Sequence, residues 1–275
     1  MQLINKLEKK RKKLLLKLLI PFISLTLVVV FGFFMMIKAG VLAPLVLLVF
    51  IYIFIFYRLK FKVANSFIAF YNEAIFSQIS TKFNSLKYSR NPKFSMEKFE
   101  PLFAKKVGFF NANDEIRGEF GGVWFSFCDG RLDFSEIGFK GKLFIAEFNK
   151  IFLSKVVLRN SGLFDVGKLK MLKTDNVLIN KSYEIYCENE IEAMYILSPN
   201  LLEKLLVLTD NGAIKADVMF DTNHIYLAVN SQKDSLEPNL FKSINSLETD
   251  EFIKEIKSFF ELISYLSLDK RIWKK

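Results

Sequence analysis

The chain has 275 residues, of which 51% are hydrophobic and 15% aromatic, and its formal net charge at pH 7 is +10. Residues 1–62 hold 11 of the 39 basic residues and one of the 29 acidic residues, which leaves 28 of each sign in residues 63–275. The excess positive charge therefore belongs to the N-terminal part. The remainder lacks the basic surface that nucleic-acid binding requires, so we expect no nucleic acid as a partner.

Two apolar runs follow the first basic residues. Residues 18–37 and 39–57 carry no charge, and each run has about the 20 residues that a helix needs to cross the hydrocarbon core of a bilayer. Both runs are apolar on all sides, which favours membrane helices over a buried soluble hairpin or a cleaved signal peptide. We expect a two-helix transmembrane hairpin over residues 18–57.

Basic residues flank this hairpin at its two open ends. They are Lys6, Lys9, Lys10, Arg11, Lys12, Lys13 and Lys17 before it, and Arg58, Lys60 and Lys62 after it. Only Lys38 marks the turn between the runs, so the positive-inside rule predicts two spans with both termini in the cytoplasm, at the bacterial inner (cytoplasmic) membrane. The lipid bilayer is the first expected partner, because these cations can contact anionic headgroups.

A helical stalk is expected after the hairpin, over residues 61–86. Phe67, Tyr71 and Ile75 recur at every fourth position and predict an apolar face. Packing of this face on the following domain is favoured over dimerisation or membrane contact. The pattern stops near Arg90, so we divide the chain into a basic cytosolic tail (1–17), the hairpin (18–57), the stalk (58–90) and a cytosolic domain (91–275).

The cytosolic domain is predicted to be α+β, with an antiparallel sheet and flanking helices and a candidate sub-boundary near 160–176. In its first half we expect a short helix capped by Ser95, a strand over 116–127 and a hairpin turn at Asp129 and Gly130. Gly121 and Gly122 inside that strand are expected to mark a bulge or a close backbone approach, which is favoured over a phosphate loop. Further strands are expected over 131–134, 139–148 and 155–159.

The second half of the domain mixes strands and helices. Strands are expected over 177–179 and 183–187, a helix over 188–197, a hairpin of 214–220 with 224–229, and a C-terminal helix over 250–266. Ser198 and Pro199 suit the N-cap and the first position of a helix over 201–208. We therefore expect a structural role for this pair.

Several runs of this domain resemble a known family. They are Phe139-Lys140-Gly141, Tyr183 to Tyr186 leading into residues 192–199, the strand 225–228, and Ile272-Trp273. Together with the twin apolar runs they resemble the bacterial domain of unknown function 3137 family over nearly the whole chain. The resemblance implies a membrane-anchored protein without established activity, in a family associated with LemA-type membrane proteins. It transfers no catalytic or binding residue.

Few residues suggest chemistry. His224 is the only histidine and opens an expected strand, so a surface or capping role is favoured over catalysis. Cys128 and Cys187 lack the spacing of a metal pair and are expected to be buried thiols. Glu184, Glu188, Glu190 and Glu192 form a local acidic cluster, for which a solvated face is favoured over a cation site. No cofactor or metal is expected.

Two functional hypotheses follow from the sequence. The favoured one is a non-enzymatic interaction or scaffold module, anchored in the membrane, that binds a membrane or cytosolic protein, a LemA-type protein or a second copy of itself. The alternative is an enzyme or small-ligand sensor with a pocket near His224 and the acidic cluster between Glu184 and Glu192. A pocket that joins His224 to two or more of those acids would favour the alternative.

Overall fold

The computed structural model of the protein describes residues 2–38, 43–80, 86–90, 96–104, 108–120, 122–133, 138–147, 151–209, 214–231, 238–244, 250, 253–254, 257, 259–260 and 263–264. The chain divides into two compact units. Unit 1 comprises Met1–Gln78 and Ser235–Asp250, and unit 2 comprises Ile79–Asp234 and Glu251–Lys275. The polypeptide therefore leaves unit 2 after residue 234 and returns to it at residue 251.

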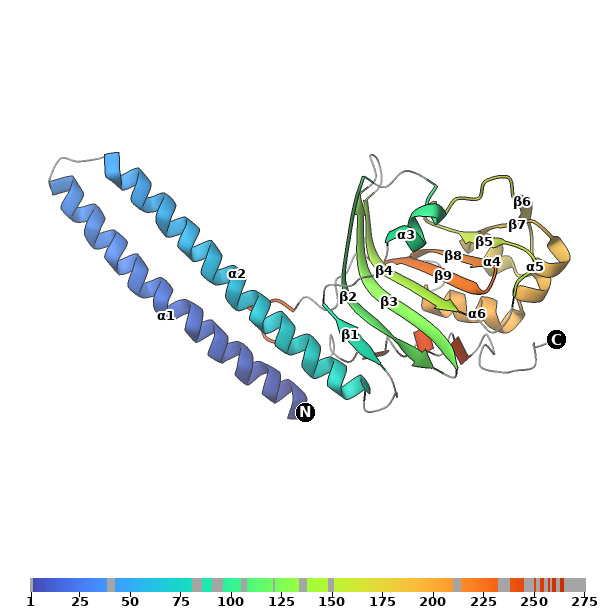
Figure 1. Cartoon of the computed structure of the whole chain (residues 1–275), viewed down its shortest axis with the longest axis horizontal. Coiled ribbons are helices and arrows are strands. Elements are labelled where there is room, and N and C mark those ends of the chain that lie inside the picture. The colour runs from blue at the N-terminus through green and yellow to red at the C-terminus, as the bar shows by residue number, and fades with distance from the viewer. Residues whose placement is uncertain are drawn as a thin grey trace. The chain divides into compact units, whose positions relative to one another are not determined.

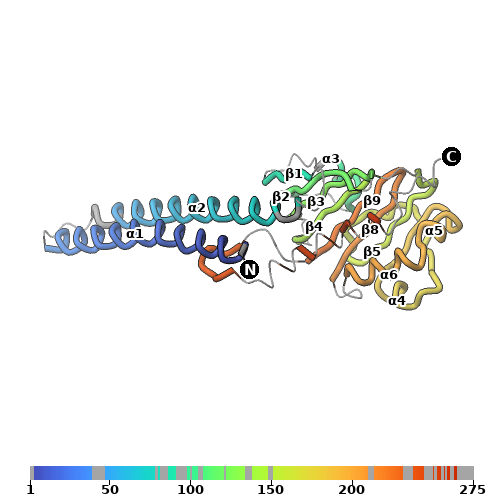
Figure 2. Tube along the Cα trace, turned by 90° about the horizontal axis from the view of Figure 1, so that it is seen from below, coloured from blue at the N-terminus to red at the C-terminus, as the bar shows by residue number. Residues whose placement is uncertain are grey.

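Unit 1 is built on two long helices, α1 (Gln2–Lys38) and α2 (Ala43–Ser80). They lie side by side in both views (Figures 1 and 2). The basic residues of 1–17 are thus part of α1, and the expected stalk helix is the last part of α2. Residues 81–85 of the expected stalk lie outside the described part of the chain.

The two helices contact each other through aromatic and hydroxyl side chains near their middle. The ring of Phe22 lies 5.9 Å from Tyr52 and 4.7 Å from Phe56, and the hydroxyls of Thr26 and Tyr52 are 3.0 Å apart. Large apolar side chains on the outer surface are exposed, among them Phe31 on α1. Within the described residues, one helix, Leu3–Lys38, is long and apolar enough to cross a membrane.

Unit 2 is an α+β unit, as the sequence predicted. Its described strands form one nine-stranded antiparallel sheet in the order β1-β2-β3-β4-β9-β8-β5-β7-β6 (Figure 1). The strands are β1 (Lys87–Ser89), β2 (Phe109–Phe120), β3 (Val123–Asp133), β4 (Gly138–Glu147), β5 (Val156–Arg159), β6 (Lys170–Leu172), β7 (Glu184–Cys187), β8 (Lys215–Asp221) and β9 (His224–Asn230). The helical elements are α3 (Met96–Phe99), η1 (Glu100–Leu102), α4 (Val177–Ser182), α5 (Glu190–Ile196) and α6 (Pro199–Leu208).

The sheet buries apolar side chains on both faces. On one face Cys128, Leu143 and Met219 pack with Phe99 of α3 and with Phe164. On the other face the rings of Phe127 and Phe144 lie 4.8 and 5.3 Å from Phe259, and Phe125 lies 5.0 Å from Phe260. The described residues between 250 and 264 are helical, as the expected C-terminal helix requires.

Two predictions in the first half of the domain are wrong. Phe120 of β2 pairs with Val123 of β3, and Gly122 has a φ of 81°, so the chain reverses direction here and the expected strand over 116–127 is not continuous. Asp129 and Gly130 lie inside β3 and pair with β2 on one side and β4 on the other, so no hairpin begins there. The Asp-Gly pair suggested a turn, but the long strands on both sides keep it extended.

The second half follows the predictions with one exception. Residues 177–179 form the start of helix α4 instead of a strand, because the Asn176 side chain accepts hydrogen bonds from the backbone N–H groups of Leu178 and Ile179. The expected strand at β7, the helices α5 and α6, and the β8–β9 hairpin are confirmed. Ser95, the expected cap of α3, lies outside the described residues.

Gly141 of β4 provides a test of this packing. A Cβ atom at this position would lie 1.9 Å from the carbonyl oxygen of Val229 on the neighbouring β9. We expect Gly141→Ala to lower the free energy of unfolding by about 1–3 kcal/mol, because the two strands must separate. Thermal unfolding of the full chain in detergent measures the change.

Gly138, in the same strand, is the matched control, since a Cβ atom there meets nothing within 4 Å. Gly138→Ala should change the stability by no more than about 0.5 kcal/mol. Equal melting temperatures for the two variants would contradict the β4–β9 register.

Candidate functional site

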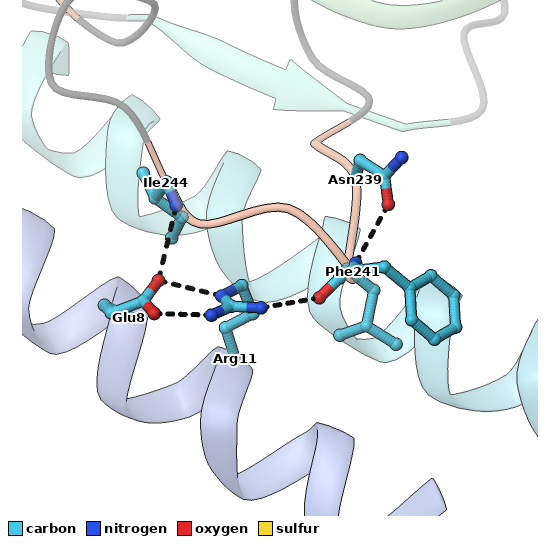
Figure 3. A network of polar contacts seen from close by, with 6 residues as sticks. Glu8, Arg11, Asn239, Phe241 and Ile244 are labelled. Atoms are coloured by element: carbon cyan, nitrogen blue, oxygen red, sulfur yellow. Dashed lines mark hydrogen bonds and ion pairs between the residues drawn. The ribbon is translucent and has the colours of Figure 1, made fainter.

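The candidate site lies where residues 238–244, here called the strap, cross the basic end of α1 (Figure 3). On α1, Leu7, Arg11, Leu14 and Leu18 recur at intervals of three and four residues, which places them on one face of the helix. All four are buried. The N-terminal part of α1 is therefore amphipathic. Its basic side chains differ in burial, because Arg11 is buried whereas Lys9, Lys12 and Lys13 are exposed.

Leu240 fixes the strap through apolar contacts. Its side chain is 3% exposed and packs in one cluster with Leu14 and Leu18 of α1 and Phe67 of α2. Ile244, at the end of the strap, lies against the same cluster. Phe67 is the first residue of the predicted stalk stripe, and this residue is covered by α1 and the strap within unit 1.

An ion pair on α1 holds the polypeptide of the strap. Arg11 donates from Nε and Nη2 to the two carboxylate oxygens of Glu8, at 2.8 and 2.5 Å. Its remaining nitrogen, Nη1, donates to the Leu240 carbonyl at 3.0 Å. Glu8 also accepts the backbone N–H of Ile244 at 3.3 Å. The Glu8–Arg11 pair thus binds the backbone of the strap at two points, the carbonyl of Leu240 and the N–H of Ile244.

Electrostatics favours the charged form of this pair at every physiological pH. The hydrogen bonds from Arg11 lower the pKa of Glu8 from 4.5 to about 2, and Glu8 raises the pKa of Arg11. Because the pKa of Glu8 is lower in the folded protein, its contribution to stability is complete above about pH 4.5. That contribution is lost only as the pH falls through about 2.

The other predicted basic residues divide into two groups. Lys10 lies 4.8 Å from the Phe70 ring, Lys60 lies 5.7 Å from the strap's Phe241, and Arg58 lies 5.3 Å from Phe54. Cations over aromatic rings stabilise such contacts modestly. The second group consists of exposed side chains, those of Lys9, Lys12, Lys13, Lys17 and Lys62.

His224 is the first residue of β9, an inner strand of the sheet in unit 2. It pairs with Glu147 of β4 and Asp221 of β8, and its ring stacks on Tyr226 at 5.8 Å. Partial burial lowers the pKa of His224, which favours the neutral imidazole. This is the environment of a packed surface histidine.

The predicted acidic cluster is dispersed. Glu184 lies at the start of β7, where it accepts a hydrogen bond from Tyr186. Glu188, at the other end, accepts the backbone N–H of Lys155, and Glu190 and Glu192 lie in the first turn of α5, where negative charge is favourable. None of these four is a strand partner of His224. Among the described residues, no group of three or more His, Cys, Asp or Glu is placed to hold a metal.

Comparison with protein families found a match in the second half of the chain. Residues 137–268 match the family model described as a protein of unknown function (DUF3137). These residues belong to the DUF3137 family. The match confirms the resemblance seen in the sequence, over a shorter range than the nearly whole chain that the resemblance suggested. Comparison with curated proteins gave no significant match, and comparison with solved structures gave none.

The strap lies inside the DUF3137 region, whereas Glu8 and Arg11 lie outside it. The contact therefore joins the family region to the apolar helices that precede it. Sequence reasoning missed this site because the strap is 229 positions from Arg11. The available signals were the Glu8–Arg11 spacing, which suits an ion pair on one helix, and Asn239, whose side chain accepts the N–H of Phe241 and turns the chain.

Ser198 and Pro199 hold their predicted places in the DUF3137 region. Ser198 is the N-cap residue of α6 and Pro199 opens the helix, but the Ser198 hydroxyl makes no capping hydrogen bond. Ser198 thus occupies the predicted N-cap position without a side-chain hydrogen bond to the helix. The helix is held instead by its buried leucines, among them Leu201 and Leu205.

The buried carboxylate Asp217 of β8 was not singled out in the sequence. One of its oxygens accepts the backbone N–H groups of Asn160 and Ser161 at 2.8 and 2.7 Å, and the other those of Leu163 and Phe164 at 2.6 and 2.8 Å. These four hydrogen bonds hold the loop after β5 against β8. We assign Asp217 a structural role in the DUF3137 region.

The sheet of unit 2 also contains a buried ion pair and two buried thiols. Asp129 and Lys142, which face each other across β3 and β4, form a buried ion pair. Burial raises the pKa of both Cys128 and Cys187, so these thiols are protonated and unreactive at neutral pH. Both cysteines are free, as the sequence predicted.

Replacement of Arg11 tests the strap contact. We expect Arg11→Met to destabilise the docked strap by about 1–3 kcal/mol, because the Leu240 carbonyl and Glu8 lose a charged hydrogen-bond donor. Hydrogen exchange of the full chain in detergent, followed by mass spectrometry of peptides covering residues 238–244, should then become faster.

Lys12→Met is the matched control, since it removes the same charge from an exposed neighbour. Its exchange in the strap should equal that of the unmodified protein. If Arg11→Met and Lys12→Met exchange alike, the ion pair does not hold the strap.

Proposed function

We propose that the protein is a membrane-anchored interaction module without enzymatic activity, whose unit 2 contacts a protein partner at the cytoplasmic face of a membrane. The membership of residues 137–268 in DUF3137 carries no activity with it. The proposal is therefore argued from the surfaces of the described residues.

The anchor that we propose is a pair of spans, α1 over residues 18–37 and α2 over residues 43–57. Exposed apolar side chains such as Val28 and Phe50 support both spans, since such faces are favourable against lipid. The basic residues at the open end of the hairpin support a cytoplasmic position for both termini. The strap lies at that same end, beside Arg11 and Lys60.

The observation that carries the interaction proposal is an exposed apolar surface on unit 2. Leu153 and Ile191 are 82% and 83% exposed, and a hydrogen bond of 3.0 Å from the Asn189 N–H to the Ser154 hydroxyl holds their segments together. Ile151 and Met194 extend this region, here called the 153–191 surface. Exposed apolar surface of this kind marks protein-binding sites.

Charge indicates what kind of partner the 153–191 surface binds. Glu188, Glu190 and Glu192 are close to Ile191 in the sequence, and Glu190 and Glu192 occupy the first turn of α5. Acidic residues next to exposed apolar ones favour a partner segment that carries both apolar and basic side chains. A LemA-type protein, another membrane or cytosolic protein, or a second copy of this chain is the partner to be identified.

The alternative, a pocket joining His224 to the predicted acidic cluster, is not favoured by a specific observation. The strand partners of His224 are Glu147 and Asp221, and Glu184 lies at the far end of β7. We therefore propose no enzymatic reaction.

Chemical crosslinking in native membranes tests the proposal. Affinity purification of the crosslinked full chain, followed by quantitative mass spectrometry, should recover one protein in stoichiometric amount. The Leu153→Ser, Ile191→Ser double variant should lose most of that protein, because the apolar contact is removed.

Val207→Ser is the control, since Val207 is an apolar residue of α6 that is 66% exposed and lies outside the 153–191 surface. It should recover the partner in full. Recovery of no stoichiometric protein, or equal recovery by all three forms, would refute the proposal.

A further inference from the structure

We propose that the segment of β6 and α4, residues 168–181, is a second contact surface that binds an anionic lipid bilayer. This inference rests on the proposed membrane anchor and concerns a different part of unit 2 from the 153–191 surface. Here we call it the β6–α4 surface. It combines exposed apolar side chains with lysines on one short, well-fixed segment at the end of the sheet.

The apolar part of the β6–α4 surface consists of three exposed residues. Met171 is 57% exposed, Val177 is 64% exposed and Leu178 is 59% exposed. Each has a buried near neighbour, because Leu172 and Ile179 point into unit 2. The side chains of Leu172 and Ile179 are therefore part of the core, whereas the three exposed side chains remain in contact with solvent.

Local hydrogen bonds fix the connection between β6 and α4. The Thr174 backbone N–H and hydroxyl both donate to the Asn180 side-chain oxygen at 3.1 Å, and the Asn180 amide donates back to the Thr174 carbonyl at 2.5 Å. Asn176 caps α4. The exposed apolar residues are thus held in place before any contact, which lowers the entropy cost of binding.

Lysines supply the charge of this surface. Lys168, Lys170, Lys173 and Lys181 are all exposed, and Asp175 is the acidic residue among them. Residues 63–275 as a whole have no net charge, so this local excess is a departure from the rest of the domain. Exposed apolar side chains surrounded by lysines match the interface of an anionic bilayer, where headgroups bind the cations and the apolar tips enter the acyl boundary.

Position in the fold also favours a surface contact. Among the described strands, β6 is the last of the sheet and pairs with β7, through Met171 opposite Tyr186 and Leu172 opposite Ile185. Lys170 pairs with Cys187 at the end of β7, and the next residue in the sequence is Glu188 of the acidic segment. The two surfaces thus suit partners of opposite charge.

The test uses the full chain reconstituted into vesicles. A Leu178→Cys variant is labelled with an environment-sensitive fluorophore, which is selective because Cys128 and Cys187 are buried. In vesicles of equimolar phosphatidylglycerol and phosphatidylcholine we expect strong quenching by lipids that carry a nitroxide at the acyl boundary. In phosphatidylcholine alone, or at high salt, quenching should fall several-fold, because the lysines lose their attraction.

A label at Val207 on α6 is the surface control and should be quenched weakly in both lipids. The Lys168→Gln, Lys170→Gln, Lys173→Gln, Lys181→Gln variant should lose the response at Leu178 while its circular dichroism and melting temperature stay unchanged. Equal quenching at Leu178 and Val207, or no dependence on phosphatidylglycerol, would overturn the inference.

A label at Val28 in α1 separates this inference from the proposed anchor. Deep nitroxide lipids should quench it strongly in both kinds of vesicle, since insertion of the hairpin does not require anionic lipid. Strong quenching at Val28 without quenching at Leu178 would refute the lipid surface alone. Absence of quenching at Val28 would refute the anchor.

Discussion

The buried guanidinium of Arg11 is the interaction on which unit 1 depends. A cation that is 7% exposed is stable only when acceptors replace the water it has lost. Glu8 and the Leu240 carbonyl supply those acceptors, and Glu8 also receives the Ile244 N–H. Removal of any one partner leaves a polar group enclosed without compensation, so the hydrogen bonds of this contact depend on one another.

The strap belongs to unit 1, but in the sequence it lies between two segments of unit 2. The strap follows β9, and it precedes Phe259 and Phe260, which pack on the aromatic face of the sheet. The strap is therefore held on α1 at Leu240, although the segments before and after it in the sequence belong to unit 2. A fragment beginning at residue 91 keeps Leu240 but loses its partners Leu14, Leu18 and Phe67, so its strap would expose apolar surface to water.

Local patterns in the sequence were sufficient for most elements of the fold. The β8–β9 hairpin, α6 and the two apolar helices follow from alternation, helical spacing and hydropathy. The Asp129–Gly130 turn and the strand at residues 177–179 were wrong, since long-range pairing in β3 and the Asn176 cap outweigh the local pattern. The strap and the loop bound by Asp217 depend on partners more than fifty positions away, which a single sequence does not reveal.

The most direct measurement of the central claim is a photocrosslink from the strap itself. A diazirine amino acid placed at position 240 of the full chain, activated in native membranes and mapped by mass spectrometry, should react within the same molecule at residues 7–18 or 59–67. A diazirine at position 241, whose Phe241 side chain is half exposed, should react far less at residues 7–18. Crosslinks from position 240 to residues 79–234, or equal yields from the two positions, would contradict the docking of the strap on the helical hairpin.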